Sequence, residues 1–185
     1  MMPTRRGLLA SGTVAMLLGA RKPDPARAGT ATKLVPVTPP RPAPETPFTT
    51  ADGASRRIAD YAGKTLLVNL WATWCAPCVA ELPSLAALAQ NLAQESILVL
   101  PISSDRGGAA RVQAFYAAHG ITALPVLIDK DAALAHAFAV RGVPTTFVID
   151  RAGRIVAMEE GGMDWNTPAV AARVRELAGT ERVPA

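Results

Sequence analysis

Cysteine and histidine are scarce in this chain of 185 residues, which has two of each: Cys75 and Cys78, His119 and His136. A closed structural zinc site needs four ligands, and these histidines lie far from the cysteines and far from each other, which disfavours zinc. A framework disulfide is disfavoured as well. It would close a loop of only four residues, Cys75 to Cys78, and so short a loop constrains the unfolded chain little.

Long apolar runs are lacking at the start of the chain. The apolar stretch 7–20 spans fourteen residues, whereas a helix that crosses a bilayer needs about 20. It follows Arg5 and Arg6 and precedes a small-x-small cleavage site ending at Ala28, so residues 1–28 are predicted to be an export signal. The arginine pair resembles a twin-arginine signal. An uncleaved N-terminal membrane anchor is the alternative, and both interpretations place the domain in the periplasm or cell envelope. No cysteine lies near the cleavage site, which excludes a lipoprotein anchor.

An excess of positive charge is lacking once this signal is set aside. The whole chain carries 19 basic and 15 acidic residues, and residues 1–28 hold five of the basic and one of the acidic ones, which leaves 14 of each. No nucleic-acid or anionic-membrane partner is therefore predicted. Residues 29–47 are rich in proline and poor in large apolar side chains, which predicts a Pro-rich linker in an extended conformation.

From residue 48 onward the pattern changes to short elements separated by turn residues. The predicted elements are a hairpin of residues 48–50 and 56–58, strands at 65–70, 97–102 and 125–128, helices near 76–94 and 109–119, a helix capped by Asp131 that ends at Phe138, a hairpin of 145–149 with 155–158, and a helix near 167–178. Their order predicts one α/β domain over residues 48–185. It has a central mixed β-sheet with helices on both faces and an N-terminal β-hairpin extension.

The most informative feature that is present is Cys75-Ala76-Pro77-Cys78, which follows the apolar segment 66–71. That segment is typical of a buried central strand, so the two cysteines are expected to begin the next helix. Unpaired backbone N–H groups and the helix dipole favour negative charge there, and hence the thiolate of the first cysteine. A dithiol/disulfide exchange centre is favoured over half of a zinc site.

These residues resemble the thioredoxin superfamily and, within it, the exported TlpA/ResA/CcmG-like thiol-disulfide oxidoreductases. The resemblance covers about residues 46–179. It is strongest over residues 68–78 with Glu81, and a second signature lies at residues 141–145, where the family has a cis proline at the position of Pro144. The resemblance implies a thioredoxin-like fold. It also implies no metal and no cofactor apart from a redox-active disulfide between the two cysteines.

The resemblance implies a role for each site residue. Cys75 is expected to attack a partner disulfide as the thiolate, and Cys78 to resolve the mixed disulfide. Pro144 is expected to keep a neighbouring N–H away from the sulfurs. The residues expected to contact the substrate are Trp74, Ala76, Pro77 and Val143, the last through its backbone.

Glu81 is the third candidate for the chemistry. Asn69 stands where cytosolic thioredoxin carries a buried acid, and Glu81 lies three residues past Cys78, where the TlpA/ResA-like group carries one. Residues three apart share a helix face, so Glu81 is assigned to proton handling for Cys78. The alternative is a solvated carboxylate, because lone acids are mostly exposed.

Several other polar or aromatic residues are interpreted as structural. Trp71 is expected to pack in the core. His119 suits the last turn of a helix, where a cation is favoured, and His136 lies among alanines on a short helix. The pair Glu159-Glu160 is interpreted as a solvated edge.

The functional prediction is an exported thiol-disulfide oxidoreductase that reduces client disulfides in the cell envelope. By family analogy the clients belong to cytochrome c maturation or to assembly of an oxidase copper site, and the electrons come from a membrane donor of the DsbD/CcdA type. A dithiol oxidant is the alternative within the same chemistry. A copper-binding assembly factor that uses the cysteine pair and a histidine is the alternative from another class.

Overall fold

Within residues 34–179, the sheet contains eight strands in the order β1-β8-β7-β4-β5-β6-β2-β3. The computed structural model describes residues 34–179, so the predicted export signal and residues 29–33 of the predicted linker lie outside the described residues. The elements are β1 (Val35–Pro42), β2 (Phe48–Thr50), β3 (Ser55–Arg56), the 3-10 helix η2 (Ile58–Tyr61), β4 (Thr65–Trp71), α1 (Ala76–Asn91), β5 (Ile97–Ser103), α2 (Gly108–His119), β6 (Leu127–Ile128), α3 (Ala133–Ala137), β7 (Thr145–Ile149), β8 (Arg154–Glu160) and α4 (Pro168–Leu177).

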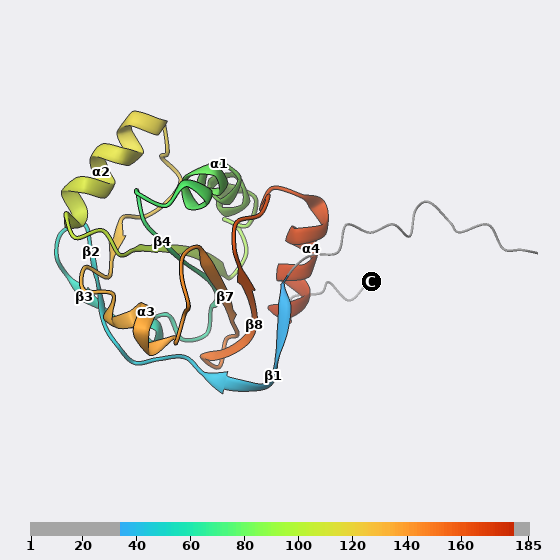
Figure 1. The fold of residues 1–185 in the computed structure, drawn as a ribbon. Coiled ribbons are helices and arrows are strands. Elements are labelled where there is room, and N and C mark those ends of the chain that lie inside the picture. The colour runs from blue at the N-terminus through green and yellow to red at the C-terminus, as the bar shows by residue number, and fades with distance from the viewer. Residues whose placement is uncertain (1–33, 180–185) are drawn as a thin grey trace, which may run out of the picture.

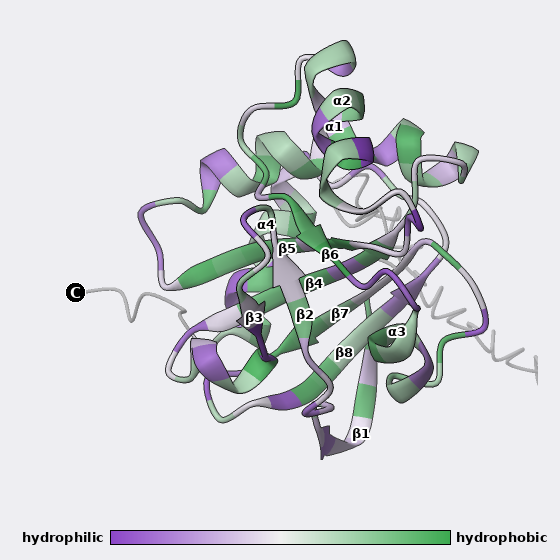
Figure 2. Cartoon of the chain, turned by 90° about the vertical axis from the view of Figure 1, so that its left-hand side faces the viewer, coloured by the Kyte–Doolittle hydropathy of each residue, from purple (hydrophilic) through white to green (hydrophobic). Residues whose placement is uncertain are grey.

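Strand β4 lies at the centre of the sheet, and every one of its residues is buried. It pairs in parallel with β5 and antiparallel with β7, which makes the sheet mixed, as predicted. Successive side chains of a strand point to opposite faces. Leu67 and Trp71 accordingly pack with α1, α2 and α4, whereas Leu66, Val68 and Leu70 pack with α3 and η2. Helices thus cover both faces of a hydrophobic sheet (Figures 1 and 2).

The predicted linker is wrong over residues 35–42, because this segment forms strand β1. It pairs antiparallel with β8, with Val35 opposite Met158 and Pro42 opposite Arg154. A proline donates no ladder hydrogen bond, but an edge strand needs donors on one side only, so its prolines are tolerated. The folded domain therefore begins before residue 48, and β1 closes one edge of the sheet (Figure 1).

The other elements match the prediction with two differences. The N-terminal hairpin is confirmed as β2 and β3, but Ile58 belongs to η2, and β2 also pairs with β6. The predicted cap at Asp131 is wrong. Helix α3 begins after Ala132, and the carboxylate of Asp129 accepts hydrogen bonds from the backbone N–H groups of Leu134 and Ala135. Within residues 34–179, no helix has the length and apolar character that crossing a membrane requires.

Candidate active site

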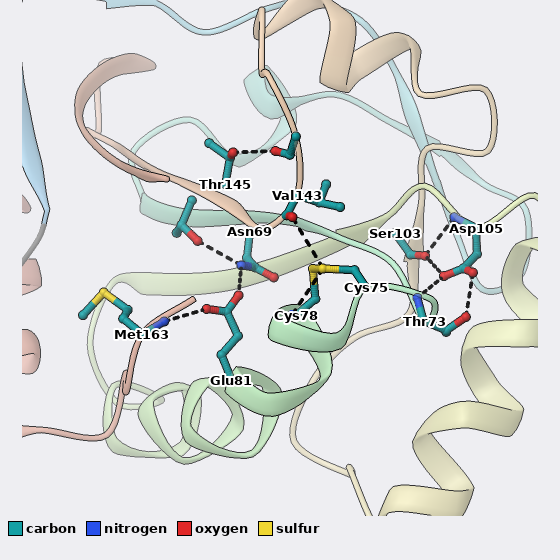
Figure 3. The surroundings of a disulfide bond; sticks show 12 residues. Asn69, Thr73, Cys75, Cys78, Glu81, Ser103, Asp105, Val143, Thr145 and Met163 are labelled. Carbon is teal, nitrogen blue, oxygen red and sulfur yellow. Dashed lines mark hydrogen bonds between the residues drawn. A yellow bond between two sulfur atoms is a disulfide. The ribbon is translucent and has the colours of Figure 1, made fainter. Parts of the chain in front are cut away.

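The two cysteines form a disulfide at the start of α1, directly after the central strand (Figure 3). Cys75 is the N-cap residue of the helix, and its sulfur accepts a hydrogen bond from the backbone N–H of Cys78 at 3.3 Å. Cys78 is fully buried, whereas Cys75 retains 6 % exposure. An incoming disulfide can therefore reach the sulfur of Cys75 more easily than that of Cys78.

The second sequence signature lies against the first. The peptide bond between Val143 and Pro144 is cis, as predicted, and the carbonyl oxygen of Val143 lies 3.5 Å from the sulfur of Cys75. The hydroxyl of Thr145 donates to the carbonyl of Gly142 at 2.7 Å, which fixes the turn before β7. Two motifs that are more than sixty residues apart in the chain thus meet at one sulfur atom (Figure 3).

The expected substrate-contact residues surround this point. Trp74, immediately before Cys75, is 69 % exposed. Ala76 and Pro77 are exposed in the first turn of α1, and Val143 is half-buried. The structure therefore brings all four to the surface next to the disulfide.

Glu81 is almost completely buried, with 3 % exposure, so the solvated-carboxylate alternative is wrong. Its Oε1 accepts from the side-chain amide of Asn69 at 2.8 Å. Its Oε2 accepts from the indole N–H of Trp165 at 2.9 Å and from the backbone N–H of Met163 at 3.2 Å. The carboxylate is buried because its face of α1 packs on β4 and the loop between β8 and α4 covers it.

Burial raises the pKa of Glu81, and its hydrogen bonds from Trp165, Asn69 and Met163 offset this only in part. The charge of Glu159 raises the pKa further. Glu159 is itself buried, with 5 % exposure, so the predicted solvated edge is wrong for this residue. A carboxyl with a raised pKa holds its proton to a higher pH than a solvated one, which suits it to exchange protons at the site.

Sequence reasoning missed the loop that covers Glu81. A Cβ atom at Gly162 would lie 3.2 Å from the carbonyl oxygen of Pro77, so a larger residue here would require the loop or the start of α1 to shift by a few tenths of an ångström. The pair Gly161-Gly162 is the one local signal that could have indicated it. Trp165 gave no such signal, because it contacts Glu81 across 84 positions of sequence.

A second buried carboxylate, also missed from the sequence, lies on the other side of the disulfide. Asp105 is 4 % exposed. Its oxygens accept from the backbone N–H of Thr73 at 2.8 Å and from its hydroxyl at 2.7 Å, and from the hydroxyl of Ser103 at 2.7 Å. Arg111 donates to the Thr73 hydroxyl at 3.2 Å. This network fixes the residue that precedes Trp74 and Cys75 (Figure 3).

The remaining candidates lie outside the reactive centre. Trp71 is fully buried and stacks on Tyr116 with ring centroids 5.7 Å apart, which confirms the core assignment. His119 lies in the last turn of α2, where its Nδ1 is 2.9 Å from the carbonyl of Phe115. His136 is exposed on α3. Among residues 34–179, no three or more His, Cys, Asp or Glu side chains are grouped so that they could hold a metal ion.

The fold and the site define a class: a thioredoxin-like α/β protein with a dithiol/disulfide centre at the start of a helix and a cis proline beside it. The chain belongs to the AhpC/TSA family, whose model matches residues 39–158.

Known proteins agree with this class. The chain is 31 % identical over 121 residues to the thiol-disulfide oxidoreductase ResA of Geobacillus thermodenitrificans, which is 65 % of this chain and 68 % of that protein. It is 33 % identical over 122 residues to the thioredoxin-like protein YneN of Bacillus subtilis, or 65 % and 71 % of the two chains. The crystal structure of the pneumococcal exposed lipoprotein thioredoxin of Streptococcus pneumoniae superposes with a TM-score of 0.61 at 28 % identity, covering 72 % of this chain and 99 % of that one. This protein is accordingly a thiol-disulfide oxidoreductase.

Proposed function

We propose that this protein reduces disulfide bonds of client proteins in the cell envelope through the pair Cys75 and Cys78. The observation that carries the direction is the surroundings of the Cys75 sulfur. Its two polar contacts are the N–H of Cys78 and the carbonyl oxygen of Val143, and neither is a cation. Without a cation in contact, only the start of α1 stabilises the thiolate, and a less stabilised thiolate corresponds to a reduced form that gives up its electrons more readily, hence to a lower reduction potential.

The proposed reaction begins with the reduced protein. The Cys75 thiolate attacks one sulfur of the client disulfide, so that a mixed disulfide forms and the other client sulfur leaves and takes up a proton. Cys78 then loses its proton and attacks the sulfur of Cys75, which releases the second client sulfur as a thiol. The client gains two electrons, and the protein ends with the Cys75–Cys78 disulfide that the structure contains.

Glu81 is the proposed acceptor for the proton of Cys78. Cys78 is fully buried and needs a local base, and Glu81 lies one helical turn further along the same face of α1. A surface cavity lined by Glu81, Pro77, Gly162, Met163 and Asp164 lies beside the carboxyl. It provides a path by which the proton reaches solvent.

The client is proposed to lie across the surface formed by Trp74 and Pro77, with an extended segment paired to the backbone at Val143. The proposed clients are apocytochrome c, at its haem-binding cysteines, or a protein that carries the thiols of an oxidase copper site. The electrons for the reduction come from a membrane donor of the DsbD/CcdA type. Residues 1–28, which resemble a twin-arginine signal, support a location in the cell envelope. So does the similarity to the exposed lipoprotein thioredoxin of Streptococcus pneumoniae.

The direction of electron flow is tested by the reduction potential of the cysteine pair, measured by equilibration with glutathione and with a stronger dithiol. We expect a value near or below about −270 mV, the potential of thioredoxin. A value near about −120 mV, that of a strong oxidant, would overturn the proposal and assign the protein to disulfide formation.

The order of the two cysteines is tested by trapping. Cys78→Ser should accumulate mixed disulfides with clients in cells, because nothing resolves them, whereas Cys75→Ser should accumulate none. Equal trapping by both variants would contradict the assignment of Cys75 as the attacking thiol. Fractionation of cells that express the full chain tests the location. Arg5→Lys with Arg6→Lys should retain the protein in the cytoplasm, and Arg21→Lys serves as the control.

A further inference from the structure

A groove of about 860 Å³ lies beside the disulfide on the side of Asp105. It is bounded by the loop before the first cysteine, the loop between β5 and α2, and the segment from β6 to α3. Its lining includes one aromatic and several charged or titratable side chains: Trp74, Arg106, Arg111, Lys130, Asp131 and His136. Trp74 and Val35 are the two exposed large apolar side chains within residues 34–179. The groove therefore combines basic groups with the aromatic side chain of the residue that precedes Cys75.

The charge of this groove is positive. Arg106, Arg111 and Lys130 are exposed cations, and the acidic residues of its lining are Asp105 and Asp131. Asp105 is buried, and its oxygens are already occupied by donors from its own network. The exposed charges are thus three cations against one carboxylate.

The opposite side of the disulfide has no such excess of cations. Glu81 and Asp164 line the cavity there, and Glu160 is exposed in an ion pair with Arg141. The balance of 14 basic and 14 acidic residues after residue 28 therefore conceals a local excess of cations in the groove. The prediction from net charge that neither nucleic acid nor an anionic membrane binds concerns the whole surface, and it does not exclude an acidic protein segment in this groove.

We infer that the basic groove binds an acidic segment of the client protein, next to the disulfide that the site reduces. The inference rests on the proposed function, since it concerns the partner of the same sulfur. Arg106 and Lys130 are suited to pair with carboxylates of the client, and Trp74 provides an aromatic anchor of the kind that dominates binding at interfaces. The groove begins at the residue before Cys75, so an occupant here is continuous with whatever reacts at that sulfur. A hollow of this size suits a peptide segment better than the flat surface of a membrane.

The test uses two peptides that share one intramolecular disulfide and differ only in flanking residues, glutamate in one and glutamine in the other. The reduced full-length protein is mixed with each peptide. The second-order rate constant for reduction is measured by alkylating the peptide thiols that have formed at successive times. We expect the glutamate peptide to react about tenfold faster at low salt, with the ratio falling towards one at about 0.5 M salt, because salt screens charges on the surface.

Substitutions locate the effect. Arg106→Gln with Lys130→Gln should abolish the preference while both peptides are still reduced, and Arg106→Glu with Lys130→Glu should reverse the preference towards a lysine-flanked peptide. The matched control is Lys64→Gln with Arg151→Gln. These two exposed cations lie at the other end of β4, where the N–H of Gly63 bonds to the carbonyl of Arg151. This control should retain the full tenfold ratio.

Three results would overturn the inference. Equal rates with the two peptides, while both are reduced, reject it and leave the proposed function intact. A preference that survives Arg106→Gln with Lys130→Gln places recognition elsewhere on the surface. Equal rates together with binding to vesicles of phosphatidylcholine and phosphatidylglycerol that these substitutions abolish would assign the groove to a lipid surface. Failure of the proposed function is seen separately, as no reduction of either peptide together with a reduction potential in the range of an oxidant.

Discussion

Glu81 and Asp105 are two buried carboxylates on opposite sides of the same disulfide (Figure 3), and their hydrogen-bond donors come from different parts of the chain. Their exposures are similar, 3 % and 4 %, and each accepts hydrogen bonds from three donor groups. The donors to Asp105 come from Ser103, the last residue of β5, and from Thr73, in the loop that follows the neighbouring strand β4. The donors to Glu81 come from a strand and from a loop more than eighty positions later in the chain.

The difference teaches that burial and the number of donors do not by themselves decide the role of a carboxylate. Asp105 ties down the loop that presents the reactive cysteine, and it lies at the edge of a basic groove. Glu81 lies in the hydrophobic layer between α1 and the sheet near the charge of Glu159, where burial raises its pKa. The first arrangement holds the loop before Cys75, and the second holds the carboxyl that we propose as the proton acceptor for Cys78.

Removal of the positioning carboxylate should have the largest effect on stability. Asp105→Ala leaves the N–H and hydroxyl of Thr73 and the hydroxyl of Ser103 without their acceptor, and each unsatisfied buried group costs about 1–3 kcal/mol. We expect the free energy of unfolding of the oxidised protein to fall by about 3 kcal/mol in urea titrations. Asp131→Ala, an exposed residue of the same groove, is the control and should stay within about 0.5 kcal/mol. A loss below about 1 kcal/mol for Asp105→Ala would show that the network does not hold the loop.

The next largest effect is expected on the other side, from Trp165→Phe. This change removes the indole donor to Glu81 and leaves unfilled volume, so we expect a loss of about 2 kcal/mol in the free energy of unfolding. Because that donor lowers the pKa of Glu81, the pKa should rise further in the variant, as measured by carboxyl carbon NMR against pH.

Trp71→Phe is the matched control for the effect of volume. Trp71 is also fully buried, and its indole nitrogen has no hydrogen-bond partner among the described residues. The two variants lose the same atoms, but only Trp165→Phe removes a donor from the carboxyl. An equal shift of the Glu81 pKa in both would mean that packing, and not the hydrogen bond, sets it.

A smaller effect, visible mainly against pH, is expected from Glu81→Gln. The folded-state pKa of Glu81 lies above its ordinary value of 4.5, so the folded protein binds the proton more tightly than the unfolded chain. Stability should therefore fall as the pH rises from about 4.5 to the folded-state pKa, with a slope of at most about 1.4 kcal/mol per pH unit for one proton. Glu81→Gln should lack this fall.

The control residue is Glu160, whose effect on the pH dependence of stability is expected to be opposite to that of Glu81. Arg141 lowers the pKa of Glu160, so Glu160 contributes stability that is lost as the pH falls below 4.5, and Glu160→Gln should remove that loss. The exposed position of this pair makes its contribution small. All measurements use the oxidised protein, because the disulfide cysteines do not titrate. A wild-type protein whose pH dependence matches Glu81→Gln would refute the raised pKa.

The parts of the fold and site that could be predicted from the sequence are those specified by residues close together in the chain. The unbroken apolar run of β4 is typical of a strand buried on both faces. The cysteine spacing places both sulfurs on the first turn of a helix, and the resemblance around Pro144 indicated the cis bond that the structure contains.

The parts that could not be predicted depend on distant partners or on loop geometry. The prolines of residues 35–42 argue against a strand, and only the free edge of β8 makes one possible. Asp129 and Asp131 are equally good caps by composition. The left-handed conformation of Ala132, with φ of 55°, decides in favour of Asp129. The burial of Glu81 depends on Met163 and Trp165, which have no local signature.

The smallest effect is expected from Arg111→Gln, and it separates the two halves of the Asp105 network. Arg111 is exposed and reaches the carboxylate only through the hydroxyl of Thr73, to which its Nε donates at 3.2 Å. Solvent screens such a cation, so the free energy of unfolding should change by no more than about 0.5 kcal/mol in urea titrations. The hydrogen bonds from Thr73 and Ser103 remain in this variant, whereas Asp105→Ala removes them. A loss comparable to that of Asp105→Ala would mean that positive charge beside the loop, and not the donor groups, holds the carboxylate, and Asp105 would then resemble an ion-pair partner more than a clamp.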